Sequence, residues 1–200
     1  MINQPQSLPQ LLRILRQAPD LWQHSSRVAW LARRIGEAVG LPPTAVAQLH
    51  QAGQVHDVGK LTLPTGLWHN TGPLTAADWA LVRQHPSHGA AALERCGADD
   101  VAAIVVQHHE RWDGSGYPSG RAGEQIHPAA RILAVADTVV AICSDRPYRN
   151  CRPYHVALQV LQSGAGLQFD PALVGMFVGI WPACHPPAPL TLPLPQLGVA

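Results

Sequence analysis

The sequence predicts an all-α domain, and two patterns carry that prediction. Apolar residues recur at helical spacing along most of the chain, for example on one face of residues 8–15. No segment alternates apolar and polar residues as a half-buried strand would. The 200 residues, 46% of them hydrophobic, suffice for one domain with a sizeable core and leave little room for a second. We therefore expect a single domain over residues 1–181, followed by a proline-rich tail over residues 182–200.

Local signals set the order of the expected helices. The leucine-rich first helix is followed by an apolar face that Gly40 ends, and Thr44 can cap the next helix. After a connection rich in proline and glycine, Thr75 and Asp78 form a capping-box pattern for a short helix. The other helices are recognised by apolar residues at helical spacing. In order, the expected helices cover residues 8–15, about 28–39, 44–55, a short segment after Thr75, 87–95, 100–110, 128–144, 153–162 and 171–180.

Composition limits the classes of partner. A net charge of +1 with 14% charged residues argues against the broad basic face that binding a nucleic-acid polymer requires, so any polyanion must be bound locally. Residues 1–17 lack the apolar core of a signal peptide, and no apolar run is long enough to span a bilayer. The four cysteines form no Cys-x-x-Cys pair, which fits reduced thiols. We therefore expect a cytoplasmic protein that does not contact a membrane.

Two histidine motifs predict a metal site. His108 and His109 follow an apolar run and lead into a glycine-rich segment. Neighbouring positions on a helix point about 100° apart, so two adjacent histidines can reach different ions, which favours more than one metal. Upstream, His56 precedes Asp57, whose two carboxylate oxygens can bridge two ions. Lys60, the only lysine in the chain, follows three residues later.

Taken together, these motifs resemble the HD-GYP subfamily of the HD-superfamily metal phosphohydrolases. Each string alone is a weak signal, but five in the order of the family make coincidence very unlikely. The resemblance runs from about Asp20 to Pro171 and implies an HD-domain helical bundle extended by C-terminal helices, with a glycine-rich GYP loop. The strings are His56-Asp57, Gly59-Lys60, His108-His109-Glu110 with Asp113-Gly114-Ser115-Gly116-Tyr117-Pro118, Ala136-Asp137, and Arg146-Pro147-Tyr148-Arg149.

The resemblance implies two metal ions that share Asp57. Iron or manganese is favoured, because the donors are imidazoles and carboxylates without a thiolate. Asp20 lies four residues before His24 and would share its helix face, where family members with a third metal carry a glutamate. Because aspartate is shorter than glutamate, two alternatives stay open. Asp20 binds a third ion, or it is exposed or caps the helix. The first ion would be held by His24, His56, Asp57 and Asp137, and the second by Asp57, His85, His108 and His109.

Other readings of single residues remain open at this point. Asp137 lies in an apolar segment that is expected to be buried, so its carboxylate needs a partner, either a metal ion or Arg131. Of the histidines that match no ligand position, His88 lies three residues after His85 and can share its helix face. We interpret these histidines as surface or satisfied core residues: His50, His69, His88, His127, His155 and His185.

The activity that the resemblance implies is hydrolysis of cyclic di-GMP to the linear dinucleotide pGpG, with GMP as a further product left open. Two ions suit this reaction, because they hold and deprotonate a bridging water in line with the leaving oxygen. We assign Asp57 and Lys60 to catalysis, and Lys60, Arg146 and Arg149 to the phosphates. The alternative for the two arginines is a solvated turn.

Tyr117, in the glycine-rich loop, can stack on a guanine, contact a signalling partner protein or belong to a plain structural turn. Two alternatives to the implied activity are kept. One is a phosphohydrolase for another cyclic dinucleotide or nucleotide, because the motifs specify phosphate chemistry rather than base choice. The other is a catalytically weak signalling module that binds cyclic di-GMP or a partner protein.

Overall fold

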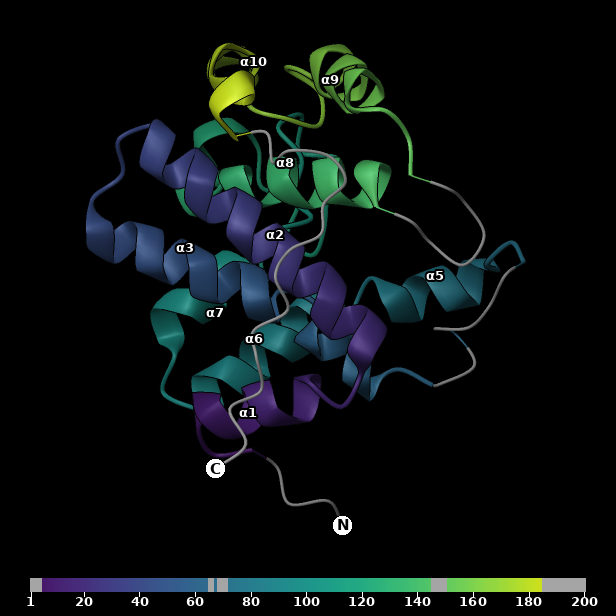
Figure 1. Cartoon of the computed structure of the whole chain (residues 1–200). Coiled ribbons are helices and arrows are strands. Elements are labelled where there is room, and N and C mark those ends of the chain that lie inside the picture. Colours follow the sequence, from purple (N-terminus) through teal and green to yellow (C-terminus); the bar gives the residue numbers. More distant parts are fainter. Residues whose placement is uncertain (1–4, 65–66, 68–71, 145–150, 185–200) are drawn as a thin grey trace.

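The structure is a computed structural model that describes residues 5–64, 67, 72–144 and 151–184, without the side chains of residues 181–184 (Figure 1). Within these ranges every regular element is a helix, apart from one isolated bridge between Ala165 and Phe169, which confirms the all-α prediction. The elements are α1 (Leu8–Leu15), α2 (Pro19–Ala38), α3 (Pro43–Val55), η1 (Val58–Thr62), α5 (Ala76–Val82), α6 (His85–Arg95), α7 (Asp99–Val105), η2 (Gly123–Gln125), α8 (Pro128–Cys143), α9 (Tyr154–Ser163) and α10 (Pro171–Cys184).

Helices α2, α3 and α8 form the centre of the bundle. Helix α2 packs along both α3 and α8, and α7 also packs against α3. Gly53 of α3 permits the close contact with α2, because a Cβ at this position would lie only 2.5 Å from the Cα of Ala29. The close approach brings the N-terminal half of α2 near the end of α3. The largest fully buried apolar side chains include Leu15, Ile35, Leu49, Ile104, Leu133, Leu161 and Phe177.

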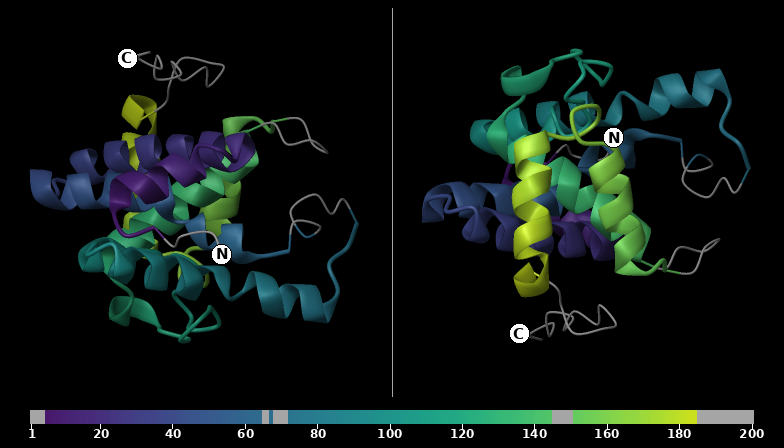
Figure 2. Two further views of the ribbon diagram at one scale, coloured as in Figure 1. Left: turned by 90° about the horizontal axis from the view of Figure 1, so that it is seen from below. Right: turned by 90° about the horizontal axis from the view of Figure 1, so that it is seen from above.

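The short helix η1 lies directly against α6. A Cβ at Gly59 would collide with the backbone of His85 and Gly89, so only glycine allows this approach. The contact fixes the residues around Gly59 next to the start of α6. Helix α5 extends away from the rest of the bundle, while α9 and α10 cover the opposite side of α8 from α3 (Figures 1 and 2).

Several helix ends differ from the sequence predictions. The capping box is confirmed, since Thr75 Oγ1 accepts from Asp78 N and an Asp78 carboxylate oxygen accepts from Thr75 N. The proposed cap at Thr44 is wrong, because α3 begins at Pro43 and its N-cap is Pro42. Helix α2 begins at Pro19, before the apolar face that signalled it, and so includes residue 24.

Helix α7 ends at Val105, whereas the sequence predicted a helix to residue 110. The backbone after Val105 tightens into turns in which Gln107 N and Glu110 N donate to the carbonyl groups three residues earlier. Helix α10 continues to Cys184, and residues 185–200 of the predicted proline-rich tail lie outside the described residues, so the tail stays a prediction. Among the described residues, none of the helices combines the length and hydrophobicity that a bilayer crossing requires.

Candidate metal centre

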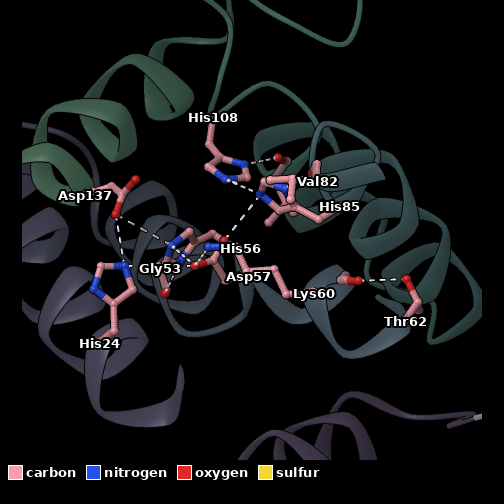
Figure 3. Close-up of polar contacts among 12 residues, drawn as sticks. His24, Gly53, His56, Asp57, Lys60, Thr62, Val82, His85, His108 and Asp137 are labelled. Carbon is pink, nitrogen blue, oxygen red and sulfur yellow. Dashed lines mark hydrogen bonds and ion pairs between the residues drawn. The ribbon is translucent and has the colours of Figure 1, made fainter. Parts of the chain in front are cut away.

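Two groups of metal-ligand side chains meet between the helices, and Asp57 belongs to both (Figure 3). One group consists of His24, His56 and Asp57, and the other of Asp57, His85, His108 and His109. Within each group the ligand atoms lie within 4.8 Å of one another. The side chains come from α2, from the turn after α3, from the first residue of α6 and from the turns after α7. Helices distant in sequence thus converge on one carboxylate.

The first cluster, as we call His24, His56, Asp57 and Asp137, is rich in carboxylates. Asp137 Oδ1 of α8 lies 3.0 Å from His24 Nε2 and 3.9 Å from His56 Nε2. His56 Nε2 lies 3.4 Å from Asp57 Oδ2, and His24 Nε2 lies 4.0 Å from the same oxygen. The alternative salt bridge from Asp137 to Arg131 is not formed, since Arg131 pairs with Asp170 at 3.1 Å. Asp137 therefore faces the histidines.

The second cluster, Asp57, His85, His108 and His109, is rich in imidazoles. His85 Nε2 lies 3.3 Å from Asp57 Oδ1 and 3.3 Å from His108 Nε2. The rings of His108 and His109 have centroids 4.0 Å apart and an interplanar angle of 39°. Both histidines follow the end of α7 and belong to the same cluster, so the prediction that they lie on a helix is wrong.

Three of the histidines are held by the backbone in one orientation. The Nδ1 atoms of His56, His85 and His108 lie 2.9, 2.6 and 2.6 Å from the carbonyl oxygens of Gly53, Val82 and Val105, each three residues earlier. A carbonyl oxygen only accepts, so we assign the proton to Nδ1 in each ring. The lone pair is then on Nε2, which faces the cluster. This is the tautomer and orientation that metal-ligating histidines adopt.

The buried donor atoms fit a metal better than they fit one another. His85 Nε2 and His108 Nε2, both assigned as lone-pair acceptors, face each other at 3.3 Å without a proton to share. His56 Nε2 and Asp57 Oδ1 are buried and have no hydrogen-bond partner among the described residues. Buried polar atoms without partners are costly, and a cation between these donors would satisfy them. The residues present therefore fit a metal centre.

The pKa values of His108 and His109 keep these two histidines neutral. Burial lowers the pKa of His108 well below its ordinary value, and the neighbouring imidazoles of His109, His56 and His85 lower it further. Burial also lowers the pKa of His109 to about 3, with an added contribution from His85. Neutral imidazole is the form that ligates a metal, so these histidines need not lose a proton to bind.

The carboxylates stay ionised despite burial. Burial raises the pKa of Asp57, but Lys60, whose Nζ lies 2.6 Å from Oδ2, and the neighbouring His56 hold it well below its ordinary value. Burial likewise raises the pKa of Asp137, and the hydrogen bond and charge of His24 outweigh that effect and lower it. Burial lowers the pKa of His56, but the carboxylates of Asp57 and Asp137 raise it overall. Both carboxylates therefore carry negative charge for a cation.

A glycine-rich loop forms one rim of the centre and presents Tyr117. The ring of Tyr117 lies 4.9 Å from the ring of His109, and Tyr117 N donates to His109 O. A Cβ at Gly116 would collide with the backbone of Glu110 and Arg111, so glycine is required there. Burial raises the pKa of Tyr117, and the negative charge of Asp57 raises it further, so the phenol stays protonated.

Sequence reasoning missed the residue that holds this loop. Glu110 is 4% exposed, and its two carboxylate oxygens accept from Ser119 N at 2.7 Å and Arg121 N at 3.1 Å. The loop is thereby tied to the residue directly after His109. The available signal was a carboxylate immediately before a segment rich in glycine, whose backbone N–H groups need acceptors.

Asp20 and His88 belong to neither cluster. Asp20 is exposed in the first turn of α2, and it does not cap that helix, because the N-cap is Ala18. His88 is half-buried, and its Nδ1 lies 2.8 Å from Thr62 Oγ1. Arg146 and Arg149, predicted to bind phosphate, lie outside the described residues.

Comparisons with known proteins give matches over most of the chain. A family model described as "HD domain" matches residues 9–173. A cyclic di-GMP phosphodiesterase of Thermotoga maritima is 34% identical over 174 residues, which are 84% of this chain and 47% of that protein. A cyclic di-GMP phosphodiesterase of Pseudomonas aeruginosa is 37% identical over 189 residues, covering 91% of this chain and 45% of that protein.

Other relatives differ in the substrate that their names give. A 3'3'-cGAMP-specific phosphodiesterase of Vibrio cholerae is 33% identical over 79% of this chain and 31% of that protein. The chain spans less than half the length of each of these relatives. Among solved structures, an HDG"Y"P protein from Bdellovibrio bacteriovorus aligns with a TM-score of 0.66 and 21% identity over 80% of this chain and 52% of that one, which supports the fold.

Proposed function

The chain belongs to the HD domain family, and from this premise we propose that it is a metal-dependent phosphodiesterase that hydrolyses cyclic di-GMP to pGpG. The observation that carries the proposal is the pair of ligand clusters that share Asp57. Relatives that are 34% and 37% identical and are named cyclic di-GMP phosphodiesterases support the choice of substrate. Further hydrolysis to GMP is left open.

The first cluster would hold one ion and the second cluster another, with Asp57 between them. Imidazole and carboxylate donors without a thiolate favour iron or manganese. When bound, such a pair of ions would supply Lewis-acid chemistry that activates a water and offsets the negative charge of the phosphate. Because Asp20 is exposed and belongs to neither cluster, the arrangement favours two ions over three.

The protein's own groups would bind and orient the substrate. Lys60, whose side chain is 31% exposed, places its ammonium group beside Asp57 and at the edge of the centre, where it can meet a phosphate oxygen. The protonated phenol of Tyr117 offers a donor and an aromatic face on the other rim. Arg146 and Arg149 are proposed to add bidentate contacts to phosphate. A partner protein at the GYP loop and a cytoplasmic location stay predictions of the sequence.

A second cyclic dinucleotide is the main competing substrate. The Vibrio cholerae relative, named as specific for 3'3'-cGAMP, is 33% identical to this chain. The metal-ligand atoms of the two clusters serve the cleavage of a phosphodiester and do not indicate which bases are preferred. Base choice therefore has to be measured.

The test is turnover by the purified chain after removal of metals and reloading with iron or manganese under anaerobic conditions. Cyclic di-GMP, 3'3'-cGAMP and cyclic di-AMP are supplied separately, and products are separated by chromatography. We expect pGpG from cyclic di-GMP only in the reloaded samples, with the chelated sample as the control. Faster cleavage of another cyclic dinucleotide would mean that this compound, and not cyclic di-GMP, is the preferred substrate. No cleavage with either metal would contradict the proposed activity.

A further inference from the structure

Arg83 is a positively charged residue at the rim of the metal centre that has no role in the proposed reaction. Arg83 is the C-cap residue of α5 and lies two residues before His85. The carbonyl of the preceding residue, Val82, accepts from Nδ1 of His85. The backbone at Arg83 is therefore fixed relative to a ligand of the second cluster.

The side chain of Arg83 reaches the glycine-rich loop. Its Cζ lies over the ring of Tyr117, 5.7 Å from the centroid, and the same ring lies 4.9 Å from the ring of His109. One aromatic ring thus separates the guanidinium group from the metal centre. A cation on an aromatic face is attracted by the ring quadrupole, which limits its motion without using any of its N–H donors.

Among the residues that the structure describes, Arg83 lies on an aromatic ring without an ion pair, as Arg16 does on Trp22, whereas several other arginines pair with carboxylates. Arg33 pairs with Glu37, Arg111 with Asp113 and Arg131 with Asp170. Within the described part of the chain, the guanidinium group of Arg83 has no carboxylate within ion-pair distance, and the residue is exposed. Its planar set of donors is therefore available for an anion from solvent, and it suits bidentate binding of phosphate.

A cyclic dinucleotide brings two phosphates to the site, whereas the ligand clusters serve only the one that is cleaved. Lys60 is already engaged by Asp57 at 2.6 Å at the edge of the centre, so it is placed for the phosphate that is cleaved. We propose that Arg83, held on the ring of Tyr117, binds the second phosphate and so selects cyclic dinucleotides over diesters with one phosphate. This inference rests on the proposed function.

The experiment compares two substrates in the metal-loaded protein, cyclic di-GMP and bis(4-nitrophenyl) phosphate, which has a single phosphate. The variants are Arg83→Ala and Arg83→Lys, with Arg95→Ala as a control, because Arg95 is an exposed arginine at the opposite end of α6 from His85. The measured quantity is the ratio of kcat/KM for the two substrates. Metal content is determined on the same samples.

Losing a charge-assisted contact to phosphate is expected to lower this ratio about ten- to a hundredfold in Arg83→Ala, mainly through a higher KM for cyclic di-GMP. Arg83→Lys keeps the charge without the planar fork, so its ratio is expected between those of wild type and Arg83→Ala. Arg95→Ala should keep the wild-type ratio, and all variants should keep their metal.

Two results would overturn the assignment while leaving the proposed function intact. One is a wild-type ratio in Arg83→Ala, and the other is an equal loss on both substrates together with lost metal, which would make Arg83 a support of the centre. A wild-type protein that cleaves bis(4-nitrophenyl) phosphate but no cyclic dinucleotide would instead reject the proposed function, and the assignment of Arg83 with it.

Discussion

The two ligand clusters share Asp57 but differ in the buried polar groups that surround it. In the first cluster, a second carboxylate lies beside the histidines, with Asp137 Oδ1 3.0 Å from His24 Nε2. In the second cluster, three imidazoles meet the one shared carboxylate, and two ring nitrogens face each other at 3.3 Å. In the first cluster, a proton on His56, whose pKa is raised, can balance part of the negative charge of the carboxylates. In the second cluster, His108 and His109 stay neutral, and a metal ion would satisfy the ring nitrogens that face each other without a proton between them.

The pKa directions show the same contrast. Nearby carboxylates raise the pKa of His56 in the first cluster against the effect of burial. In the second cluster, burial and neighbouring imidazoles lower the pKa of His108 and His109. Asp57 is therefore the only negative charge of the second cluster, whereas the first cluster also contains Asp137.

The largest expected effect comes from removing the shared charge with Asp57→Asn. The shape of the side chain is kept, but both clusters lose the carboxylate that joins them, so turnover should fall at least about a hundredfold and both ions should be lost. Elemental analysis and the hydrolysis assay measure the two effects. Asp99→Asn, an exposed aspartate in the first turn of α7, is the control. Full metal content with near-normal hydrolysis in Asp57→Asn would refute the bridging role.

An intermediate effect is expected from single-cluster ligands. His108→Ala should remove the ion of the second cluster and leave the first, whereas His24→Ala should do the reverse, so each variant should retain about one of the two ions. Metal titration with thermal denaturation distinguishes the variants. His50→Ala is the matched control, because His50 contacts the carbonyl of Ala29 and belongs to neither cluster. Loss of both ions from either variant would mean that the clusters do not bind independently.

The helical architecture could largely be read from the sequence, because apolar periodicity and a capping box are local signals. The turn after Val105 could not, since the apolar residues continue to Val106 and only the backbone turns further on reveal the end of α7. The start of α6 at His85 was also missed by two residues. Proline at the second position of that helix was the available signal.

The candidate ligands were identified from motifs, but their environment was not. No local pattern indicates that His56, His85 and His108 all donate Nδ1–H to a carbonyl three residues earlier, because each of these bonds depends on where a helix ends. The contact between Arg83 and Tyr117 joins residues 34 positions apart and has no signal in a single sequence. Long-range contacts of this kind depend on tertiary packing.

The smallest expected effect is a difference in pH dependence between the clusters, measured on the metal-free protein. The pKa of His109 falls from its ordinary value of 6.5 to about 3 on folding. Between these pH values the unfolded chain binds a proton at His109 that the folded protein does not. The stability contributed by a neutral His109 is therefore present above pH 6.5 and is lost as the pH falls. His108, whose pKa is also lowered, acts in the same direction.

His56 of the first cluster acts in the opposite direction, because its pKa is raised on folding. Its contribution is fully present below pH 6.5 and is lost as the pH rises through the pKa of the folded state. Urea denaturation is measured in the presence of a chelator between pH 6.5 and pH 5. The free energy of unfolding should decrease as the pH decreases, by up to about 1.4 kcal/mol per pH unit for each histidine that is neutral in the folded protein and protonated in the unfolded chain. Replacing His109 by Asn should make this slope shallower, and replacing His56 by Asn should make it steeper. Equal slopes in wild type and both variants would remove the electrostatic contrast between the clusters, because the two histidines would then titrate alike in the folded and unfolded protein.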